Sequence, residues 1–505
     1  MVALSLKAKT RALLFTLGIV ASLGQAPFSL WPVSIGALII FFFLQFKAAG
    51  VGVGSFQRGW FFGFGYFVGT INWILEPFLI DAASHAWMAP FALALMAGGL
   101  AVFWGAGATL GQFLGDKTYS LAFSLGIAEL ARGYILTGFP WALVGYVWME
   151  TPVVQLASLV GVYGLTILTF FLVAILVEIY VKRGVLLATA MCCALIAASW
   201  IWGTYRITNL QALENAKVVR LVQPNAPQEE KWHPEHSLKF FARMLEYSAA
   251  EPKPDIVIWP ETALPIPFEY ASELLDHIRI ATKNSAILFG ALRFDGEQYF
   301  NSIFYLGQNK VAEPVYDKHH LVPFGEYLPF ESYLRRIGVG FVSQLFGLGF
   351  GVGPGPSIFM TEELGAVLPL ICYEAVFPQD TRVSGARADV LVQITNDAWF
   401  GTNSGPQQHL KKAQMRSIEQ GLTLIRVANT GISGAVDPYG RLIDSIALNQ
   451  AGYLDIRMPP AVQTPVYAHI GDWTSIFLLC FLLGMSFWKR AVTLRVDLKT
   501  KSAYP

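Results

Sequence analysis

Long apolar runs constrain the fold of this 505-residue chain more than any other feature of its sequence. Most of them approach the about 20 residues that an α-helix needs to cross the hydrocarbon core of a bilayer. Charged residues make up only 14% of the chain, well below the about 25% of soluble globular proteins. We therefore predict a polytopic α-helical membrane protein with about eight transmembrane helices. The predicted spans are residues 10–26, 31–46, 57–76, 88–114, 119–138, 153–180, 184–204 and 473–488.

Lysine and arginine residues gather at alternating ends of these runs. Lys7, Lys9 and Arg11 precede the first run, which has the composition of a signal peptide. Because further spans follow at once, we interpret this run as a retained anchor. Basic residues also fill the stretch after Trp488. Since positive charge favours the cytoplasmic side, both termini are predicted to be cytoplasmic, and the polar region before the last run is predicted to face outward.

This orientation divides the chain into four predicted parts. An N-terminal membrane domain of seven transmembrane helices covers residues 1–205, and an extracytoplasmic domain covers residues 206–470. A C-terminal transmembrane helix covers residues 471–490, and a basic cytoplasmic tail covers residues 491–505.

Two ionisable residues lie inside an apolar run. Glu129 and Arg132 are three residues apart, so on a helix they share a face and could neutralise each other toward the interior of the bundle. Charged groups within a membrane span either serve a function or pair with each other, and the sequence does not decide between the two. Residues 138–141, which follow, are predicted to end the helix or to form a re-entrant turn.

The outward region alternates short strand-like runs with stretches of helical periodicity. This alternation predicts a layered α/β domain of roughly 260 residues. Strands are predicted at residues 218–222, 256–259, 286–289, 302–306, 367–371, 390–394, 424–428 and 434–437, and helices around 238–245, at 271–282 and at 406–420.

Cys372 follows directly after one of the strand-like runs. A thiol at the end of a buried strand, where the chain turns away from the sheet, can present its sulfur to a cleft. A single cysteine is more often a small buried core residue. The other three cysteines, however, lie in the apolar runs, so Cys372 is the one thiol of the outward region. Because an exposed thiol risks oxidation there, we predict that Cys372 is kept for chemistry.

A carboxylate and an amine occupy similar positions at strand ends. Glu261 follows the strand at 256–259, and Lys318 ends another extended segment. Because strand ends of α/β sheets converge on one crevice, these two side chains and Cys372 are predicted to meet. Glutamate can take the proton of a thiol nucleophile, and lysine can stabilise the oxyanion of an acyl intermediate. Each residue alone is more often a solvated surface charge, and the pattern alone does not decide between these interpretations.

The motifs around these residues resemble the Glu–Lys–Cys signature of the nitrilase superfamily of carbon–nitrogen hydrolases. Their order within a chain of apolar spans is similar to the apolipoprotein N-acyltransferase family over nearly the whole length. The resemblance implies an αββα sandwich for the outward domain, with Glu261, Lys318 and Cys372 as its catalytic triad. The motifs are Trp259-Pro-Glu261, Lys318 with Val322-Pro-Phe-Gly-Glu326, Ile371-Cys-Tyr-Glu374, residues 138–141, Gln223-Pro-Asn225 and residues 396–401.

The resemblance implies an acyltransferase of the bacterial inner membrane, with its catalytic domain in the periplasm, that performs the last step of lipoprotein maturation. Cys372 would attack the sn-1 ester of a phospholipid, with phosphatidylethanolamine as the expected donor, and would carry the acyl chain as a thioester. The diacylglyceryl-cysteine at the N-terminus of an apolipoprotein would then accept this chain in a ping-pong mechanism. Glu261 would act as general base, and Lys318 would stabilise the oxyanion. No cofactor is implied.

Four further residues match functional positions of the family. Glu326 and Glu374 are expected to keep Lys318 charged and oriented. Tyr373 adjoins the nucleophile, and Trp232 falls at the family's essential tryptophan on an arm over the site.

A glycine-rich segment at residues 338–356 contains seven glycines together with large apolar side chains. Glycine gives the backbone freedom, and exposed apolar side chains can enter the outer leaflet of a membrane. We therefore predict a lid that gates the entry of lipid. A loop whose apolar residues pack on the domain is the alternative. The predicted lid residues are Phe341, Leu345, Phe346 and Phe350.

Other functional classes fit the sequence less well. Adjacent His319 and His320 are expected to point their rings apart, so no metal site is predicted, and Asp397 is expected to shape the wall of the cleft. A net charge of +1 without a basic block gives no surface for nucleic acid, and no glycine-rich nucleotide fingerprint follows a strand. A membrane-anchored nitrilase-type amidase remains open because it would use the same triad. A non-enzymatic transporter or receptor would have no need of that triad.

Overall fold

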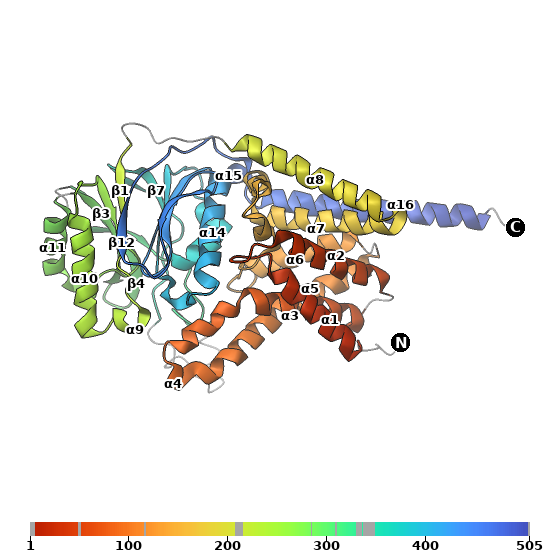
Figure 1. The fold of residues 1–505 in the computed structure, drawn as a ribbon, viewed down its shortest axis with the longest axis horizontal. Coiled ribbons are helices and arrows are strands. Elements are labelled where there is room, and N and C mark those ends of the chain that lie inside the picture. The colour runs from red at the N-terminus through yellow and green to blue at the C-terminus, as the bar shows by residue number, and fades with distance from the viewer. Residues whose placement is uncertain are drawn as a thin grey trace. The chain divides into compact units, whose positions relative to one another are not determined.

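The computed structural model divides the chain into two compact units (Figure 1). One unit comprises Met1–Thr208 and Pro465–Pro505 and is helical. The other comprises Asn209–Thr464 and contains the strands found in the described residues. The structure describes residues 6–48, 52–115, 118–207, 216–283, 285–308, 311–329, 336 and 349–502.

A helix occupies each of the apolar runs of the helical unit. The long helices are α1 (Ala8–Ser22), α2 (Trp31–Lys47), α3 (Val53–Thr70), α5 (Ala89–Leu114), α6 (Tyr119–Tyr134), α7 (Ala157–Arg183), α8 (Val185–Arg206) and α16 (Trp473–Ser502). Short helical elements lie between them: η1 (Asn72–Leu79), α4 (Ala82–His85), η2 (Ala86–Met88), η3 (Val144–Trp148), η4 (Pro152–Leu156) and α15 (Val466–Ile470).

Three helical stretches in the described part of the chain are long and apolar enough to cross a membrane. They are Ala82–Leu114, Pro152–Arg183 and Val185–Arg206, whereas α2 and Trp473–Trp488 are shorter apolar helices. Helices α1 and α6 have 15 and 16 residues. At a rise of about 1.5 Å per residue, they fall short of a hydrocarbon core of about 30 Å. The count of eight membrane spans therefore stays a prediction.

Glu129 and Arg132 form a buried ion pair on α6, so these two residues do neutralise each other. Arg132 Nη2 lies 2.6 Å from Glu129 Oε2, and 2% or less of either residue is exposed. The Arg132 guanidinium also donates to the carbonyl oxygens of Phe139 and Trp141. Between Arg132 and these carbonyls the chain leaves the helix and turns through Gly138, whose φ is +66°. The pair therefore anchors the predicted turn at residues 138–141 onto α6.

The second unit contains two six-stranded sheets. Their strand orders are β12-β1-β2-β3-β4-β5 and β11-β10-β9-β8-β7-β6. Strands β1, β2 and β3 are mutually parallel, as are β7, β8 and β9, and the other paired strands are antiparallel. The strands are β1 (Val218–Gln223), β2 (Ile256–Ile258), β3 (Ala286–Phe294), β4 (Tyr299–Leu306), β5 (Glu313–Asp317), β6 (Phe359–Thr361), β7 (Gly365–Ile371), β8 (Val390–Thr395), β9 (Thr423–Ala428), β10 (Ser433–Val436), β11 (Leu442–Ile446) and β12 (Gly452–Arg457).

The two sheets pack face to face, and helices cover their outer faces (Figure 1). The core between the sheets holds residues from both, such as Val219 of the first and Ile371 of the second. The outer face of the first sheet packs on α10 (Pro234–Ala249) and α11 (Ser272–Thr282). The outer face of the second sheet packs on α14 (Gly405–Gln420). The unit is therefore an αββα sandwich, as the family resemblance implies.

All the predicted strands and helices of this unit are present, but β6, β11 and β12 are not predicted from the sequence. Each of the three lies at an edge of its sheet and has one paired neighbour. Four of the five residues of β11 are exposed, and β6 has only three residues. An edge strand buries fewer side chains than a central strand, so its sequence carries a weaker apolar pattern.

Candidate active site

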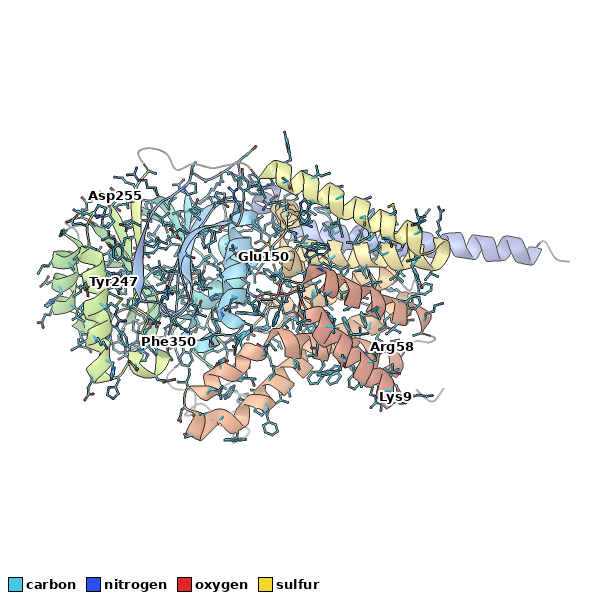
Figure 2. The ribbon with its side chains drawn as sticks, viewed as in Figure 1. Lys9, Arg58, Glu150, Tyr247, Asp255 and Phe350 are labelled. Atoms are coloured by element: carbon cyan, nitrogen blue, oxygen red, sulfur yellow. The ribbon has the colours of Figure 1, made fainter. Side chains whose placement is uncertain are left out.

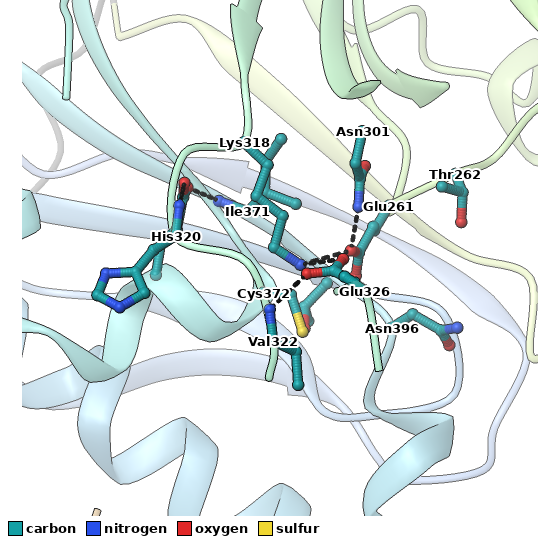
Figure 3. Close-up of polar contacts among 12 residues, drawn as sticks. Glu261, Thr262, Asn301, Lys318, His320, Val322, Glu326, Ile371, Cys372 and Asn396 are labelled. Carbon is teal, nitrogen blue, oxygen red and sulfur yellow. Dashed lines mark hydrogen bonds and ion pairs between the residues drawn. The ribbon is translucent and has the colours of Figure 1, made fainter. Parts of the chain in front are cut away.

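Three strand ends of the sandwich bring Glu261, Lys318 and Cys372 together (Figure 3). Glu261 follows the carboxyl end of β2, and Lys318 follows β5, both in the first sheet. Cys372 follows the carboxyl end of β7 in the second sheet. Because the sheets are stacked, side chains from one end of each sheet reach a common place.

Lys318 is held between two carboxylates. Its Nζ lies 2.7 Å from Glu326 Oε1 and 3.5 Å from Glu261 Oε1, and only 1% of the residue is exposed. Its main chain is fixed as well, because its N–H donates to Asn301 O and its carbonyl accepts from the N–H of Gly353. Burial lowers the pKa of Lys318, but the two carboxylates outweigh burial, and the net pKa is raised well above its usual value. Lys318 is therefore an ammonium in the resting site.

Asn301 is a site residue that the sequence analysis does not identify. Its Nδ2 donates to Glu261 Oε1 at 2.7 Å, and only 3% of the residue is exposed. Glu261 Oε1 thus has two donors, Asn301 and Lys318. Among the described residues no donor reaches Glu261 Oε2, so this oxygen is available to take a proton. The sequence signal was a polar amide inside the apolar strand β4, because a buried amide needs partners.

Cys372 sits at a strained strand-to-helix turn. It begins the 3₁₀ helix η6 (Cys372–Val376) with a φ of +50°, a backbone region that residues other than glycine seldom occupy. Burial raises the pKa of the Cys372 thiol well above its usual value, and the Glu261 carboxylate raises it further. The Lys318 ammonium lowers this pKa but does not offset those two effects. The resting side chain is therefore a protonated thiol that needs a base.

A buried hydrogen-bond network holds the main chain of Cys372. The Cys372 carbonyl oxygen lies 3.0 Å from His409 Nε2 and accepts from Gln393 Nε2 at 3.1 Å. His409 Nδ1 lies 2.8 Å from Asp397 Oδ1, and the other oxygen of Asp397 accepts from Arg426. Burial raises the pKa of Asp397, but Arg426 and His409 outweigh it and hold that pKa well below its usual range. Asp397 is fully buried, so it supports the nucleophile instead of forming a cleft wall, contrary to the sequence prediction.

Glu374 contacts main-chain N–H groups and the His319 imidazole, not the Lys318 ammonium. Its Oε2 accepts from the N–H of Ile371 at 2.7 Å, and its Oε1 accepts from the N–H of His319 at 2.8 Å. Among the contacts of the described residues, only Glu326 of the two predicted supporting glutamates reaches Lys318 Nζ. The expectation that Glu374 keeps Lys318 charged and oriented therefore has no contact with Lys318 Nζ to support it among the described residues. Glu374 instead ties the segment after Lys318 to the turn that presents Cys372.

Tyr373 and Trp232 differ in their exposure. Tyr373 is 4% exposed, and its ring meets that of Phe377 edge-on, with centroids 4.9 Å apart. Trp232 follows the short helix α9 (Gln228–Lys231) and is 44% exposed. It lines a cavity beside Glu261, so the structure brings Trp232 to the site.

The predicted lid is only partly within the described residues. Phe341, Leu345 and Phe346 lie outside them. Phe350, labelled in Figure 2, donates its N–H to Glu326 O at 3.0 Å. The described end of the predicted lid is thus bonded to the loop that supplies Glu326.

Lys231 is a second lysine at this site, and the sequence analysis does not identify it. It lines the same cavity as Trp232 and Glu261. Its Nζ donates to Glu261 O at 3.1 Å and to Thr262 Oγ1 at 2.7 Å. In the sequence Lys231 is one of several charged residues in a short polar stretch, and nothing there indicates that it is buried. Its position next to Trp232 was the one signal that could have identified it.

Two groups of side chains in the described part of the chain have the donor types and spacing to hold a metal ion. They are His233 with Glu235 and His236, and His319 with His320 and Asp380. In the second group, Asp380 already binds both imidazoles, at 3.4 Å from His319 Nε2 and 2.9 Å from His320 Nδ1. The prediction that these two adjacent rings point apart is therefore wrong: both reach one carboxylate. The first group is largely exposed, and exposed groups of this kind are common without a metal.

Two protein families match the chain. The family described as Apolipoprotein N-acyltransferase N-terminal domain matches residues 17–175, and Carbon-nitrogen hydrolase matches residues 218–462. The apolipoprotein N-acyltransferase of Brucella melitensis is 35% identical in an alignment of 505 positions that covers 94% of each chain. The chain belongs to the apolipoprotein N-acyltransferase family. The family resemblance inferred from the sequence motifs is thereby confirmed.

Other relatives of this apolipoprotein N-acyltransferase family member are similar over comparable lengths. The apolipoprotein N-acyltransferase of Caulobacter vibrioides is 35% identical over 491 residues, which cover 93% of this chain and 92% of that one. A solved nitrilase-superfamily protein from Saccharomyces cerevisiae is 16% identical, with a TM-score of 0.35 over 50% of this chain and 92% of that one. The matched Carbon-nitrogen hydrolase region begins at β1 and contains Glu261, Lys318 and Cys372.

Proposed function

We propose that this protein transfers an acyl chain from a phospholipid to the N-terminal diacylglyceryl-cysteine of bacterial apolipoproteins. Membership of the apolipoprotein N-acyltransferase family over 94% of the chain supports an acyltransferase activity. The observation that carries the mechanism is the meeting of Glu261, Lys318 and Cys372 in the matched Carbon-nitrogen hydrolase region.

In the first half-reaction, Cys372 takes the acyl chain from the lipid. Glu261 Oε2 accepts the proton of the thiol, and Sγ attacks the carbonyl carbon of the sn-1 ester. The oxyanion that forms lies by the Lys318 ammonium, whose charge Glu326 and Glu261 maintain. When the ester C–O bond breaks, the glycerol oxygen takes the proton back from Glu261. A lysophospholipid leaves, and the acyl chain remains on Cys372 as a thioester.

In the second half-reaction, the neutral α-amino group of the diacylglyceryl-cysteine attacks the thioester carbon. Glu261 takes a proton from the attacking nitrogen, and Lys318 again stabilises the oxyanion. The C–S bond breaks, an amide remains on the lipoprotein, and the Cys372 thiol is restored by the proton on Glu261. The raised pKa of this thiol fits a nucleophile that is protonated at rest and is activated only when Glu261 accepts its proton.

Lipid substrates imply a particular placement in the cell. We propose eight membrane spans, with residues 1–205 and 471–490 in the bacterial inner membrane and residues 206–470 in the periplasm. Both termini, including the basic tail at 491–505, are then cytoplasmic. Phosphatidylethanolamine is the proposed donor, and the segment at 338–356 is the proposed lid for its entry.

A nitrilase-type amidase anchored in the membrane is the second candidate function. It would use the same three residues, with water in place of the lipoprotein amine. Family membership over both the membrane and the hydrolase regions favours the transferase.

The two candidates are separated by the products. Purified protein in detergent micelles is given phosphatidylethanolamine and a synthetic diacylglyceryl-cysteine peptide. We expect equal amounts of lysophosphatidylethanolamine and amide-acylated peptide, and a loss of at least about 10³-fold in Cys372→Ala, since removal of the nucleophile of a catalytic triad is of this order or larger. The exposed Cys480→Ala variant is the control and should keep full activity. Free fatty acid without acylated peptide would instead support the hydrolase.

A further inference from the structure

Lys231 is a buried cation that the mechanism above does not use. Only 9% of the residue is exposed, and the groups that its Nζ contacts are all uncharged: Glu261 O, Thr262 Oγ1 and the Trp232 ring, whose centroid is 5.4 Å away. No carboxylate of the described residues forms an ion pair with it. Because an ammonium without an ion-pair partner is costly to bury, its position at the site calls for a compensating role.

The charges around the nucleophile do not balance without Lys231. Glu261 and Glu326 contribute two negative charges, and Lys318 contributes one positive charge. When Cys372 passes its proton to Glu261, the total charge is unchanged, but a negative charge then sits on a buried sulfur. The Lys231 ammonium, which lines the same cavity as Glu261, brings the charge of these four side chains to zero, and a positive charge beside this buried group lowers the free energy of the thiolate.

Lys231 is bonded to the main chain of Glu261, one of the two groups that exchange the proton. Burial lowers its pKa to about 8, while Glu261 and the Cys372 thiolate each favour its charged form. The other ionisable residues of its own helix, Glu229 and Glu230, are exposed to solvent. Lys231 is therefore charged at neutral pH and loses its charge as the pH rises past about 8.

We propose that Lys231 is a positioning residue of the active site, which fastens the main chain of Glu261 to α9 and stabilises the Cys372 thiolate with its positive charge. This inference rests on the proposed function only in taking Cys372 as the nucleophile. The active site then contains two lysines with different roles. Lys318 lies by the developing oxyanion, and Lys231 offsets the charge on sulfur.

The test measures the thiolate directly. Full-length protein is treated with iodoacetamide between pH 6 and 10, and alkylation of Cys372 is followed by mass spectrometry of its peptide. Lys231→Gln removes the charge and keeps a donor for Glu261 O. We expect it to slow alkylation at pH 7.5 about 10-fold, the effect of raising the thiol pKa by about one unit. Lys231→Arg should stay within about 3-fold of the wild type at pH 7.5. Its rate should rise relative to that of the wild type above pH 8, because arginine keeps the charge that Lys231 loses there.

The matched control is Lys239→Met, which removes an exposed lysine from α10 and should leave alkylation unchanged. Equal alkylation profiles for Lys231→Gln and the wild type would overturn the proposal. Lost acyl transfer with an unchanged alkylation profile would also overturn it, because Lys231 would then be only a structural support. Alkylation needs neither lipid nor lipopeptide, so its result does not depend on whether the protein transfers acyl chains. A failure of the proposed function would therefore be distinguished from a failure of this proposal. A thermal unfolding curve for each variant shows that it is folded.

Discussion

Lys318 owes its position and charge to carboxylates from two different segments. Glu261 comes from the loop after β2, and Glu326 comes from the turn after β5, where its second oxygen accepts from the N–H of Val322. Glu326 thus fixes its own loop with one oxygen and Lys318 with the other. The placement of the ammonium depends on both bonds.

The variant Glu326→Gln tests this dependence. Glutamine can still bind the N–H of Val322, but it cannot offset the charge of Lys318. We expect the rate of acyl-enzyme formation to fall about 10- to 100-fold, as small misplacements of a catalytic group do, with little change in thermal stability. Glu313→Gln, an exposed glutamate on β5, is the control and should have the wild-type rate. A wild-type rate in Glu326→Gln would show that Glu261 alone suffices to place Lys318.

The pKa of His319 predicts how the stability of the folded protein depends on pH. Burial lowers the pKa of His319, but Asp380 and Glu374 outweigh burial and raise it to about 10. The unfolded value is about 6.5, so the folded protein holds this proton more tightly. The stabilisation is therefore full below about pH 6.5 and is lost as the pH rises through about 10.

We expect the unfolding midpoint of the wild type to fall between pH 7 and 10 by more than that of His319→Asn, which has no proton to lose. His277→Asn, at an exposed position on α11, should keep the pH dependence of the wild type. Parallel pH profiles for His319→Asn and the wild type would mean that the ion pairs of His319 do not contribute to stability.

At the scale of residues, the sequence predicts the side chains that stand at strand ends and misses those that depend on tertiary burial. An apolar run precedes each of the three triad residues, Glu261, Lys318 and Cys372, so the sequence alone shows that they stand at strand ends. Lys231 and Asn301 lie in stretches where nothing local distinguishes a buried partner from a surface residue. Glu374 accepts from two backbone N–H groups and lies 2.8 Å from the His319 imidazole, and no sequence motif encodes these partners.

At the scale of elements, the segment after residue 348 lies along the edge of the first sheet. The N–H of Gly351 donates to Tyr299 O at 2.8 Å, and the N–H of Gly353 donates to Lys318 O at 2.9 Å. A Cβ on Gly353 would lie 2.1 Å from Asp317 O, a main-chain atom that cannot move aside cheaply. The close approach of the two backbones at Lys318 therefore requires glycine.

The pair Gly353→Ala and Gly349→Ala tests this approach within one segment. A Cβ on Gly349 meets no atom within 4 Å, so this variant is the control. We expect Gly353→Ala to lower turnover at least about 10-fold by moving Lys318, because displacements of about 1 Å cost up to 100-fold. Gly349→Ala should match the wild type. Equal turnover in the two variants would show that this segment does not position Lys318.

The elements that the sequence predicts best are those buried on both faces. The central strands β2, β3, β7, β8 and β9 form apolar runs that are easily recognised. The edge strands β6, β11 and β12 are fixed by hydrogen bonding to a neighbour, so their own sequences need not be apolar. The short helices between the long apolar helices contain too few residues to show a helical repeat of apolar positions, so the sequence does not predict them.

At the scale of the whole molecule, the central prediction is the side of the membrane on which each part lies. In a variant with its four cysteines replaced by alanine, a new cysteine is placed at Ser445 or at Lys182, both exposed. We expect a membrane-impermeant maleimide to label Ser445→Cys in cells whose outer membrane is permeabilised and whose inner membrane is intact. Lys182→Cys should be labelled only after the inner membrane is opened. Labelling of Lys182→Cys in intact inner membranes would contradict the proposed orientation.

The mass of the intact protein after incubation with phosphatidylethanolamine tests most directly whether Cys372 carries the acyl chain. We expect one added acyl mass in the wild type and none in Cys372→Ala. This mass should disappear when a diacylglyceryl-cysteine peptide is added, while the peptide gains the same acyl group. An acyl mass that persists with the peptide and is removed only by water would contradict the transferase. An acyl mass retained in Cys372→Ala would contradict the role of Cys372 as nucleophile.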